Sequence, residues 1–225
     1  MISPLECVVV ETAKEISCAV IWLHGLGADG YDFQPIVENL ALPDSLGVRF
    51  IFPHAQMRPV TINGGMKMRA WYDILEMSLD RKVDMANIEE SCQQVLALIE
   101  EQLSLGVASE QIILAGFSQG GVIAYHLGLR CQYPLAGIMA LSTYLVDSEN
   151  TPDSHDSVNG QTPILIHHGT MDSIVLPQQG EQARQQLQSK GYDIQSQTYP
   201  MAHAVCPAQI GDISRWLQQQ LSANR

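Results

Sequence analysis

The stretch IILAGFSQGGVIAYHLGL, residues 112–129, joins a strand pattern to a helix pattern across a very short connection. It opens with an apolar run typical of a buried strand and closes with a longer apolar segment typical of a buried helix. Between them, Gly116-Phe117-Ser118-Gln119-Gly120 matches G-x-S-x-G, in which glycines relieve the crowding of a sharp strand-to-helix turn. The pattern predicts that Ser118 is a nucleophile at this turn. The alternative is a glycine-rich turn whose serine only caps the helix.

A serine hydroxyl is a weak nucleophile, so it needs a neighbouring base, and the base needs an orienting carboxylate. Where the serine sits on such a turn, the chain order is serine, then acid, then histidine. We predict that His203 is the base, because it follows the last expected strand and precedes the last expected helix. The other histidines after the serine lie within a helix, in a polar stretch or at a strand end: His126, His155, His167 and His168.

The acid must lie between the serine and the histidine in the chain, in a loop after a strand. Asp172 satisfies both conditions, because it follows the apolar run PILIHH and precedes His203. Asp147 also follows an expected strand and remains the alternative. We therefore predict a triad of Ser118, Asp172 and His203.

The stretch IWLHGLGADG, residues 21–30, has two interpretations. Its G-x-G-x-x-G spacing is also that of a dinucleotide-binding loop, which needs an acidic residue at the end of the next strand. The next expected strand, residues 48–52, is followed by Pro53-His54-Ala55, so that requirement is not met. The favoured interpretation is an oxyanion-hole loop, with the backbone amides of Leu26 and Gln119 as the two donors.

Strand and helix patterns alternate along the chain, which is typical of an α/β layer fold. Continuous apolar runs predict strands buried on both faces of a mostly parallel sheet, with helices on both faces. The expected strands are residues 7–12, 17–23, 48–52, 112–115, 137–141, 163–167 and 194–199. The expected helices are residues 33–40, 88–105, 119–131, 178–190 and 207–221.

Two segments interrupt this alternation. Residues 53–84 carry several aromatic and aliphatic side chains, and we expect them to form a loop that covers the site. Residues 147–162 are polar, and we expect a solvated surface loop there. Neither resembles a linker, so we expect one α/β domain over residues 1–225, without a separate cap domain.

Composition limits the classes of partner. The formal net charge of −12 argues against nucleic acid and anionic membrane surfaces, both of which need a basic footprint. Five scattered cysteines favour reduced thiols, and the chain shows neither a signal-peptide pattern nor an apolar span long enough for stable membrane insertion. We therefore expect a cytoplasmic protein. A metal site is not expected, because His167 and His168 are adjacent on a strand and point to opposite faces.

Several motifs in order resemble the small α/β-hydrolase family of carboxylesterases and acyl-protein thioesterases. They are WLHGLGADG, RPVTINGGMKMRAWYDI, GFSQGG, HGTMD and YPMAH, and together they span nearly the whole chain. The block at residues 58–74 is most similar to the bacterial branch. The resemblance implies an α/β-hydrolase fold, the same triad and oxyanion donors, no cofactor, and a weak homodimer.

The resemblance also implies substrate-binding residues around the acyl group. These are Trp71, Ile74, Leu75, Met77, Ile174 and Val175. The chain departs from the family pattern at two places near the triad. No proline directly follows the stretch Met171-Asp172-Ser173, and alanine rather than serine follows His203. They leave the triad intact and bear on the shape of the acyl pocket.

The sequence therefore predicts a serine carboxylesterase that acts on small-molecule or lipid acyl esters, and on thioesters, through an acyl-enzyme. The alternative is a lysophospholipase or acyl-protein thioesterase with a long acyl channel. A non-catalytic binding protein on the same scaffold is disfavoured by the complete triad and by both oxyanion motifs.

Overall fold

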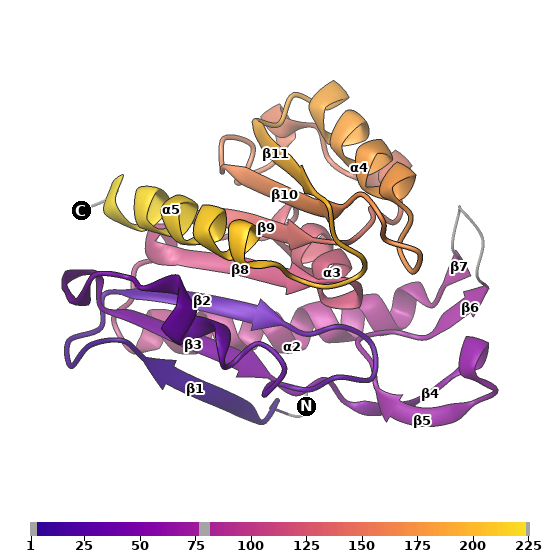
Figure 1. Ribbon diagram of the computed structural model, residues 1–225, viewed down its shortest axis with the longest axis horizontal. Coiled ribbons are helices and arrows are strands. Elements are labelled where there is room, and N and C mark those ends of the chain that lie inside the picture. Colours follow the sequence, from indigo (N-terminus) through magenta and orange to yellow (C-terminus); the bar gives the residue numbers. More distant parts are fainter. Residues whose placement is uncertain (1–3, 77–81, 224–225) are drawn as a thin grey trace.

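The computed structural model describes residues 4–76 and 82–223, and most of its strands form one seven-stranded sheet (Figure 1). The spatial order is β1-β3-β2-β8-β9-β10-β11, and only the pairing of β1 with β3 is antiparallel. The strands are β1 Cys7–Glu11, β2 Cys18–Leu23, β3 Val48–Pro53, β8 Ile112–Phe117, β9 Gly137–Leu141, β10 Ile164–Gly169 and β11 Ile194–Tyr199. The predicted mostly parallel sheet is confirmed.

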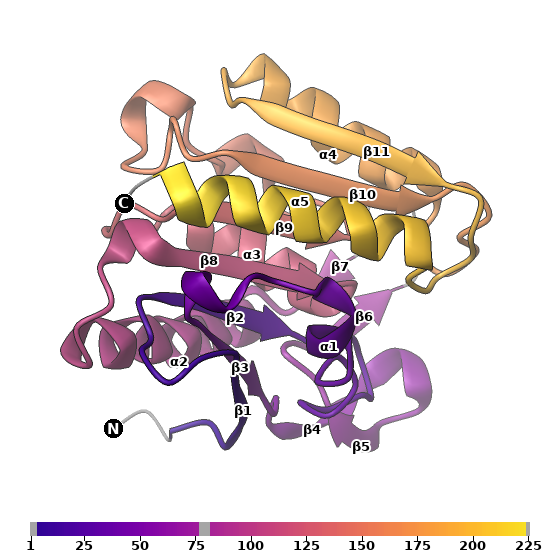
Figure 2. The ribbon, with the colours of Figure 1, turned by 60° about the vertical axis from the view of Figure 1, so that its left-hand side comes forward.

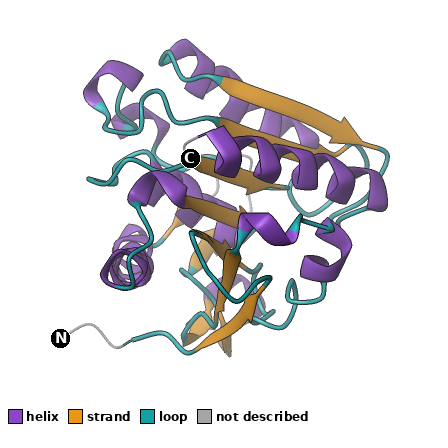
Figure 3. Ribbon diagram, turned by 90° about the vertical axis from the view of Figure 1, so that its left-hand side faces the viewer, coloured by secondary structure: helices purple, strands orange, loops and turns teal. Residues whose placement is uncertain are grey.

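Helices cover both faces of this sheet, as predicted (Figures 2 and 3). They are α1 Ile36–Leu40, α2 Met85–Ser104, α3 Gln119–Gly128, α4 Pro177–Ser189 and α5 Pro207–Ala223. Strand β2 shows the division, because Val20 and Trp22 pack in one cluster with α1 and α5, whereas Ile21 and Leu23 pack in another with α2 and α3. A continuous apolar run is therefore needed to bury this strand on both sides.

The parallel strands bring their carboxyl ends to one edge of the sheet. Neighbouring strands β8, β9, β10 and β11 all run the same way, so the segments that follow them meet at that edge. The sheet thereby brings together residues that are far apart in the chain. In open α/β sheets, ligands bind at this carboxyl edge.

Residues 53–84 do not form the expected loop. The structure instead has a hairpin of β4 Met57–Val60 with β5 Met66–Arg69, and a second pair of β6 Ile74–Glu76 with β7 Lys82–Val83. In the first hairpin, Gly64 and Gly65 follow Asn63 and take left-handed φ values of 66° and 78°. The Asn-Gly-Gly turn was the available signal for a hairpin, but its strands are too short and too polar for a strand pattern.

Residues 147–162 also differ from the expected solvated loop, because part of the segment is buried. The Asn159 side chain is 0% exposed and accepts a hydrogen bond from the Leu135 amide at 2.8 Å. Its amide group donates to the Tyr133 carbonyl at 3.0 Å and to the Cys131 carbonyl at 3.3 Å. Asn159 thus satisfies backbone groups between α3 and β9 that burial would otherwise leave unpaired.

Candidate active site

Ser118 lies on the tight turn between β8 and α3. Its backbone has φ 53° and ψ −117°, a conformation that L-residues rarely adopt and that marks a strained functional turn. A Cβ at Gly116 would lie 2.2 Å from the Gly120 carbonyl oxygen, and a Cβ at Gly120 would lie 2.5 Å from the Leu23 carbonyl oxygen. Both flanking positions therefore require glycine, which is the physical reason for the G-x-S-x-G pattern.

The structure brings Ser118, His203 and Asp172 into one hydrogen-bonded series. The Ser118 hydroxyl lies 2.9 Å from His203 Nε2, and His203 Nδ1 lies 2.7 Å from Asp172 Oδ2. Asp172 comes from the loop after β10 and His203 from the loop after β11, so two adjacent parallel strands present the acid and the base together. The geometry suits transfer of the serine proton to His203.

The carboxylate of Asp172 is held by its own loop. Asp172 is 3% exposed, and its Oδ1 accepts hydrogen bonds from the amides of Ile174 and Val175, each at 2.9 Å. Oδ2 is thereby left for the His203 ring. His168, which sequence reasoning did not assign to the site, supports this loop by donating from Nε2 to the Val175 carbonyl at 2.8 Å.

Asp147, the alternative acid, has different partners. Its carboxylate lies 3.8 Å from the Arg130 guanidinium and accepts a hydrogen bond from the Asn150 side chain at 2.6 Å. The structure therefore places Asp172, and not Asp147, beside the His203 ring.

The two predicted oxyanion donors lie on segments that pack against each other. A Cβ at Gly120 would lie 2.5 Å from the Leu23 carbonyl oxygen and 2.6 Å from that of His24, so the start of α3 packs closely on the chain that leads into the Leu26 loop. Among the described residues, neither the Leu26 amide nor the Gln119 amide donates to another group. A Cβ at Gly25, next to Leu26, would lie 3.5 Å from the Ser118 Cβ, so both free amides are on segments next to Ser118, which suits an oxyanion hole.

The side chain of Gln119 has a second function that the sequence did not reveal. Its Oε1 accepts a hydrogen bond from the Trp71 amide at 2.8 Å, and its Nε2 donates to the Tyr72 carbonyl at 2.7 Å. The Trp71 indole in turn donates to the His24 carbonyl at 2.9 Å. Gln119, Trp71 and His24 thus fix the loop of one oxyanion donor to the helix of the other.

His24 sits under the oxyanion loop as a neutral imidazole. Its Nε2 accepts from the Ala55 amide at 3.1 Å, so the proton is on Nδ1, which donates to the Gly25 carbonyl at 2.6 Å. Burial lowers the pKa of His24 to about 4. Burial likewise lowers the pKa of His167 to about 4, at a position where its ring packs edge-on against Tyr199.

These two histidines predict how stability depends on pH. In the folded state each imidazole stays neutral down to about pH 4, whereas in the unfolded chain each takes up a proton near pH 6.5. Between these values the unfolded state binds more protons, so the free energy of unfolding falls as the pH is lowered, by up to roughly 3 kcal/mol for each histidine. Denaturant unfolding at pH 7, 6 and 5 measures this slope, and His167→Gln is expected to reduce it. An unchanged slope in that variant would contradict the assignment.

The predicted substrate-binding residues divide into a buried and an exposed set. Trp71, Ile74 and Val175 are at most 3% exposed and belong to one hydrophobic core cluster. Leu75 and Ile174 are 47% and 52% exposed and present apolar surface next to these core positions. Met77 lies outside the described residues.

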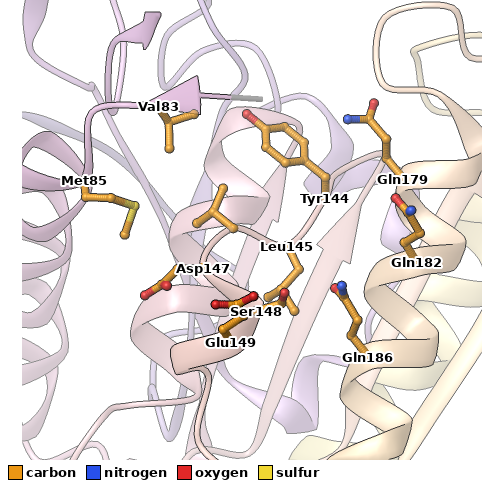
Figure 4. Close-up of a pocket in the computed structure, with 11 residues that line it drawn as sticks. Val83, Met85, Tyr144, Leu145, Asp147, Ser148, Glu149, Gln179, Gln182 and Gln186 are labelled. Atoms are coloured by element: carbon orange, nitrogen blue, oxygen red, sulfur yellow. The ribbon is translucent and has the colours of Figure 1, made fainter. Parts of the chain in front are cut away.

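A cavity of about 450 Å³ opens between α4 and the loop that follows β9 (Figure 4). Gln179, Gln182 and Gln186 line it from α4, and Tyr144 and Leu145 line it from the loop. Ser118 and His203 do not line this cavity, and its glutamine-rich wall does not resemble an acyl-binding surface. This cavity therefore does not bear on the long acyl channel of the alternative interpretation.

Among the described residues, only one group of side chains lies close enough together to hold a metal ion, and it is exposed: Asp153, His155 and Asp156. His167 contacts Tyr199, whereas His168 contacts the Val175 carbonyl, so these neighbouring rings do not converge. In the part of the chain that the structure describes, no helix combines the length and apolar character needed to cross a membrane.

A serine on a strained turn, with a histidine and an aspartate brought to it by the loops after later parallel strands, places this chain among the serine hydrolases of the α/β-hydrolase fold. The chain belongs to the phospholipase/carboxylesterase family, whose family model matches residues 5–221. It is therefore a carboxylic ester hydrolase.

Relatives and solved structures extend this assignment. The chain is 35% identical to acyl-protein thioesterase 1 of Gibberella zeae, over 98% of this chain and 96% of the relative. It is 36% identical to acyl-protein thioesterase 1 of Neurospora crassa, over 91% and 87%. The crystal structure of Zea mays acyl-protein thioesterase 2 superposes with a TM-score of 0.81 at 25% identity, covering 96% of this chain and 99% of the other. Arabidopsis thaliana SOBER1 gives 0.81 at 28% identity, over 91% and 99%. These relatives are eukaryotic, so the expected bacterial branch is not supported.

Proposed function

We propose that this protein hydrolyses carboxylic esters and thioesters through a covalent acyl-enzyme on Ser118. The observation that carries the proposal is the continuous series from the Ser118 hydroxyl through His203 to the buried carboxylate of Asp172. Ser118 attacks the carbonyl carbon while His203 Nε2 takes the serine proton. Asp172 keeps the proton of the neutral ring on Nδ1 and stabilises the imidazolium that forms.

The amides of Leu26 and Gln119 then hold the oxyanion of the tetrahedral intermediate, and each such donor contributes about 10²- to 10³-fold in rate. His203 passes its proton to the leaving oxygen or sulfur as the acyl-enzyme forms. Water repeats the attack with His203 again as the base, and the acid is released. None of these reaction steps uses a metal or an organic cofactor.

The acyl group is proposed to lie over Leu75 and Ile174, the exposed members of the predicted substrate-binding set. Both side chains are about half exposed, which favours a general esterase of short and medium acyl chains. The alternative, a lysophospholipase or acyl-protein thioesterase, is supported by the phospholipase/carboxylesterase family and by the fungal and maize relatives, which are named acyl-protein thioesterases. The expected cytoplasmic location and weak homodimer stay predictions.

A series of p-nitrophenyl esters from acetate to palmitate tests the chain-length preference. We expect kcat/KM to rise by up to about fourfold per methylene, the equivalent of burying one CH₂, and to level off at medium length. Leu75→Ala is expected to flatten the rise in kcat/KM from the acetate to the butyrate ester. The matched control is Leu105→Ala, because Leu105 is also exposed but lies at the C-terminal end of α2. A steady rise to palmitate would favour the long-chain alternative.

A further inference from the structure

A second cavity, of about 460 Å³, opens directly beside the catalytic histidine. It lies between α1 and the start of α5, which pack on the same face of the sheet (Figure 2). Its apolar walls are Phe33, Ile36, Phe117, Val205 and Ile210, and His203 forms part of its lining. The glutamine-lined cavity next to α4 lacks any residue of the triad, so this is the cavity that adjoins the chemistry.

The reaction requires one part of the substrate to lie on the His203 side. When the tetrahedral intermediate collapses, the bond from the carbonyl carbon to the leaving oxygen or sulfur breaks and its electron pair stays on the leaving atom. That atom takes the proton from His203 Nε2, so it must lie within hydrogen-bond distance of this nitrogen. The His203 ring is held against Phe117 with centroids 4.7 Å apart, which places the cavity wall next to the proton donor.

We propose that this cavity binds the alcohol or thiol portion of the substrate. It selects apolar leaving groups that are uncharged or cationic over leaving groups that are anionic. The inference rests on the proposed acyl-enzyme mechanism and adds the leaving-group class to it. The apolar walls suit an aromatic or branched aliphatic group, which gains by leaving water.

Charge at the mouth supplies the second part of the selectivity. Asp32 lines the cavity from its exposed rim, and neither a lysine nor an arginine is among the described residues that line it. Burial, together with the neighbouring Asp29, raises the pKa of Asp32, so assays are best run at pH 8, where the carboxylate is ionised. An anionic leaving group would meet this carboxylate without a lysine or arginine in the lining to offset the repulsion.

The charge is tested with two acetate esters that share one acyl group, phenyl acetate and 4-acetoxybenzoate. We expect Asp32→Asn to raise the ratio of kcat/KM for 4-acetoxybenzoate over phenyl acetate by about fivefold at low ionic strength. Glu38→Gln removes an exposed charge from α1 that does not line the cavity, and it is the matched control. The inference is overturned if Asp32→Asn and Glu38→Gln change the ratio equally.

The apolar walls are tested by filling the cavity. Ile210→Trp is expected to lower the ratio of kcat/KM for 2-naphthyl acetate over methyl acetate by at least tenfold, and an unchanged ratio overturns the inference. Thermal unfolding checks that the variant folds, and Asp32→Asn, at an exposed position, provides the test if it does not. If the wild-type protein hydrolyses none of these esters, the proposed function itself fails. If it hydrolyses them with ratios that no variant alters, only the leaving-group site fails.

Discussion

Ser118→Ala is expected to lower kcat for p-nitrophenyl acetate by roughly four to six orders of magnitude, the range seen when a triad nucleophile is removed. The reason is geometric, since only this hydroxyl lies within 2.9 Å of His203 Nε2 among the described residues. The substitution removes one oxygen and leaves the turn unchanged, so the thermal midpoint should stay within a few degrees of the wild type.

Ser142→Ala is the matched control for this experiment. Ser142 is also buried at the carboxyl end of a parallel strand and also has a positive φ, of 47°. Its hydroxyl has no partner among the described residues, and the proposed mechanism does not use it. We expect near-normal turnover in Ser142→Ala. A fluorophosphonate should label the wild type and should not label Ser118→Ala. Retention of activity by Ser118→Ala would refute the assignment of the nucleophile.

Gly120→Ala is expected to lower kcat/KM at least 100-fold and to destabilise the fold by about 1–3 kcal/mol. A Cβ at this position would lie 2.5 Å from the Leu23 carbonyl oxygen and 2.6 Å from that of His24. Both contacts are with backbone, so the loop that carries the Leu26 amide must move away from α3. The two oxyanion donors would then no longer converge on one oxygen.

Gly211→Ala separates this effect from the general effect of replacing a helical glycine. A Cβ at Gly211, within α5, would have only the Arg215 guanidinium nearby, at 3.8 Å. Alanine is the better helix former by about 1 kcal/mol, so this variant should be as stable as the wild type or more stable, and fully active. Urea unfolding and ester hydrolysis measure both variants. Equal behaviour of Gly120→Ala and Gly211→Ala would show that the packing of α3 on the oxyanion loop is unimportant.

Local rules account for the parts of the fold that the sequence predicted. Fully buried parallel strands need continuous apolar runs, so β9 was predicted with the bounds that the structure has. The bounds of β11 were also predicted, although this edge strand is mostly exposed and polar. The hairpin β4–β5 was missed because its strands are four residues each and partly exposed, which leaves too little periodicity to detect. Buried Asn159 was missed because its role depends on backbone groups elsewhere in the chain.

The sequence by itself determined the nucleophile turn, the order of Ser118, Asp172 and His203, and a sheet that brings their loops to one edge. Local crowding and strand direction suffice for these inferences. Only the tertiary structure decided that Trp71 belongs to the hydrophobic core, that the Gln119 side chain joins Trp71 and Tyr72, and that a cavity opens beside His203. These features are contacts between segments far apart in the chain, and whether a side chain lines a pocket or fills the core is set by what packs against it.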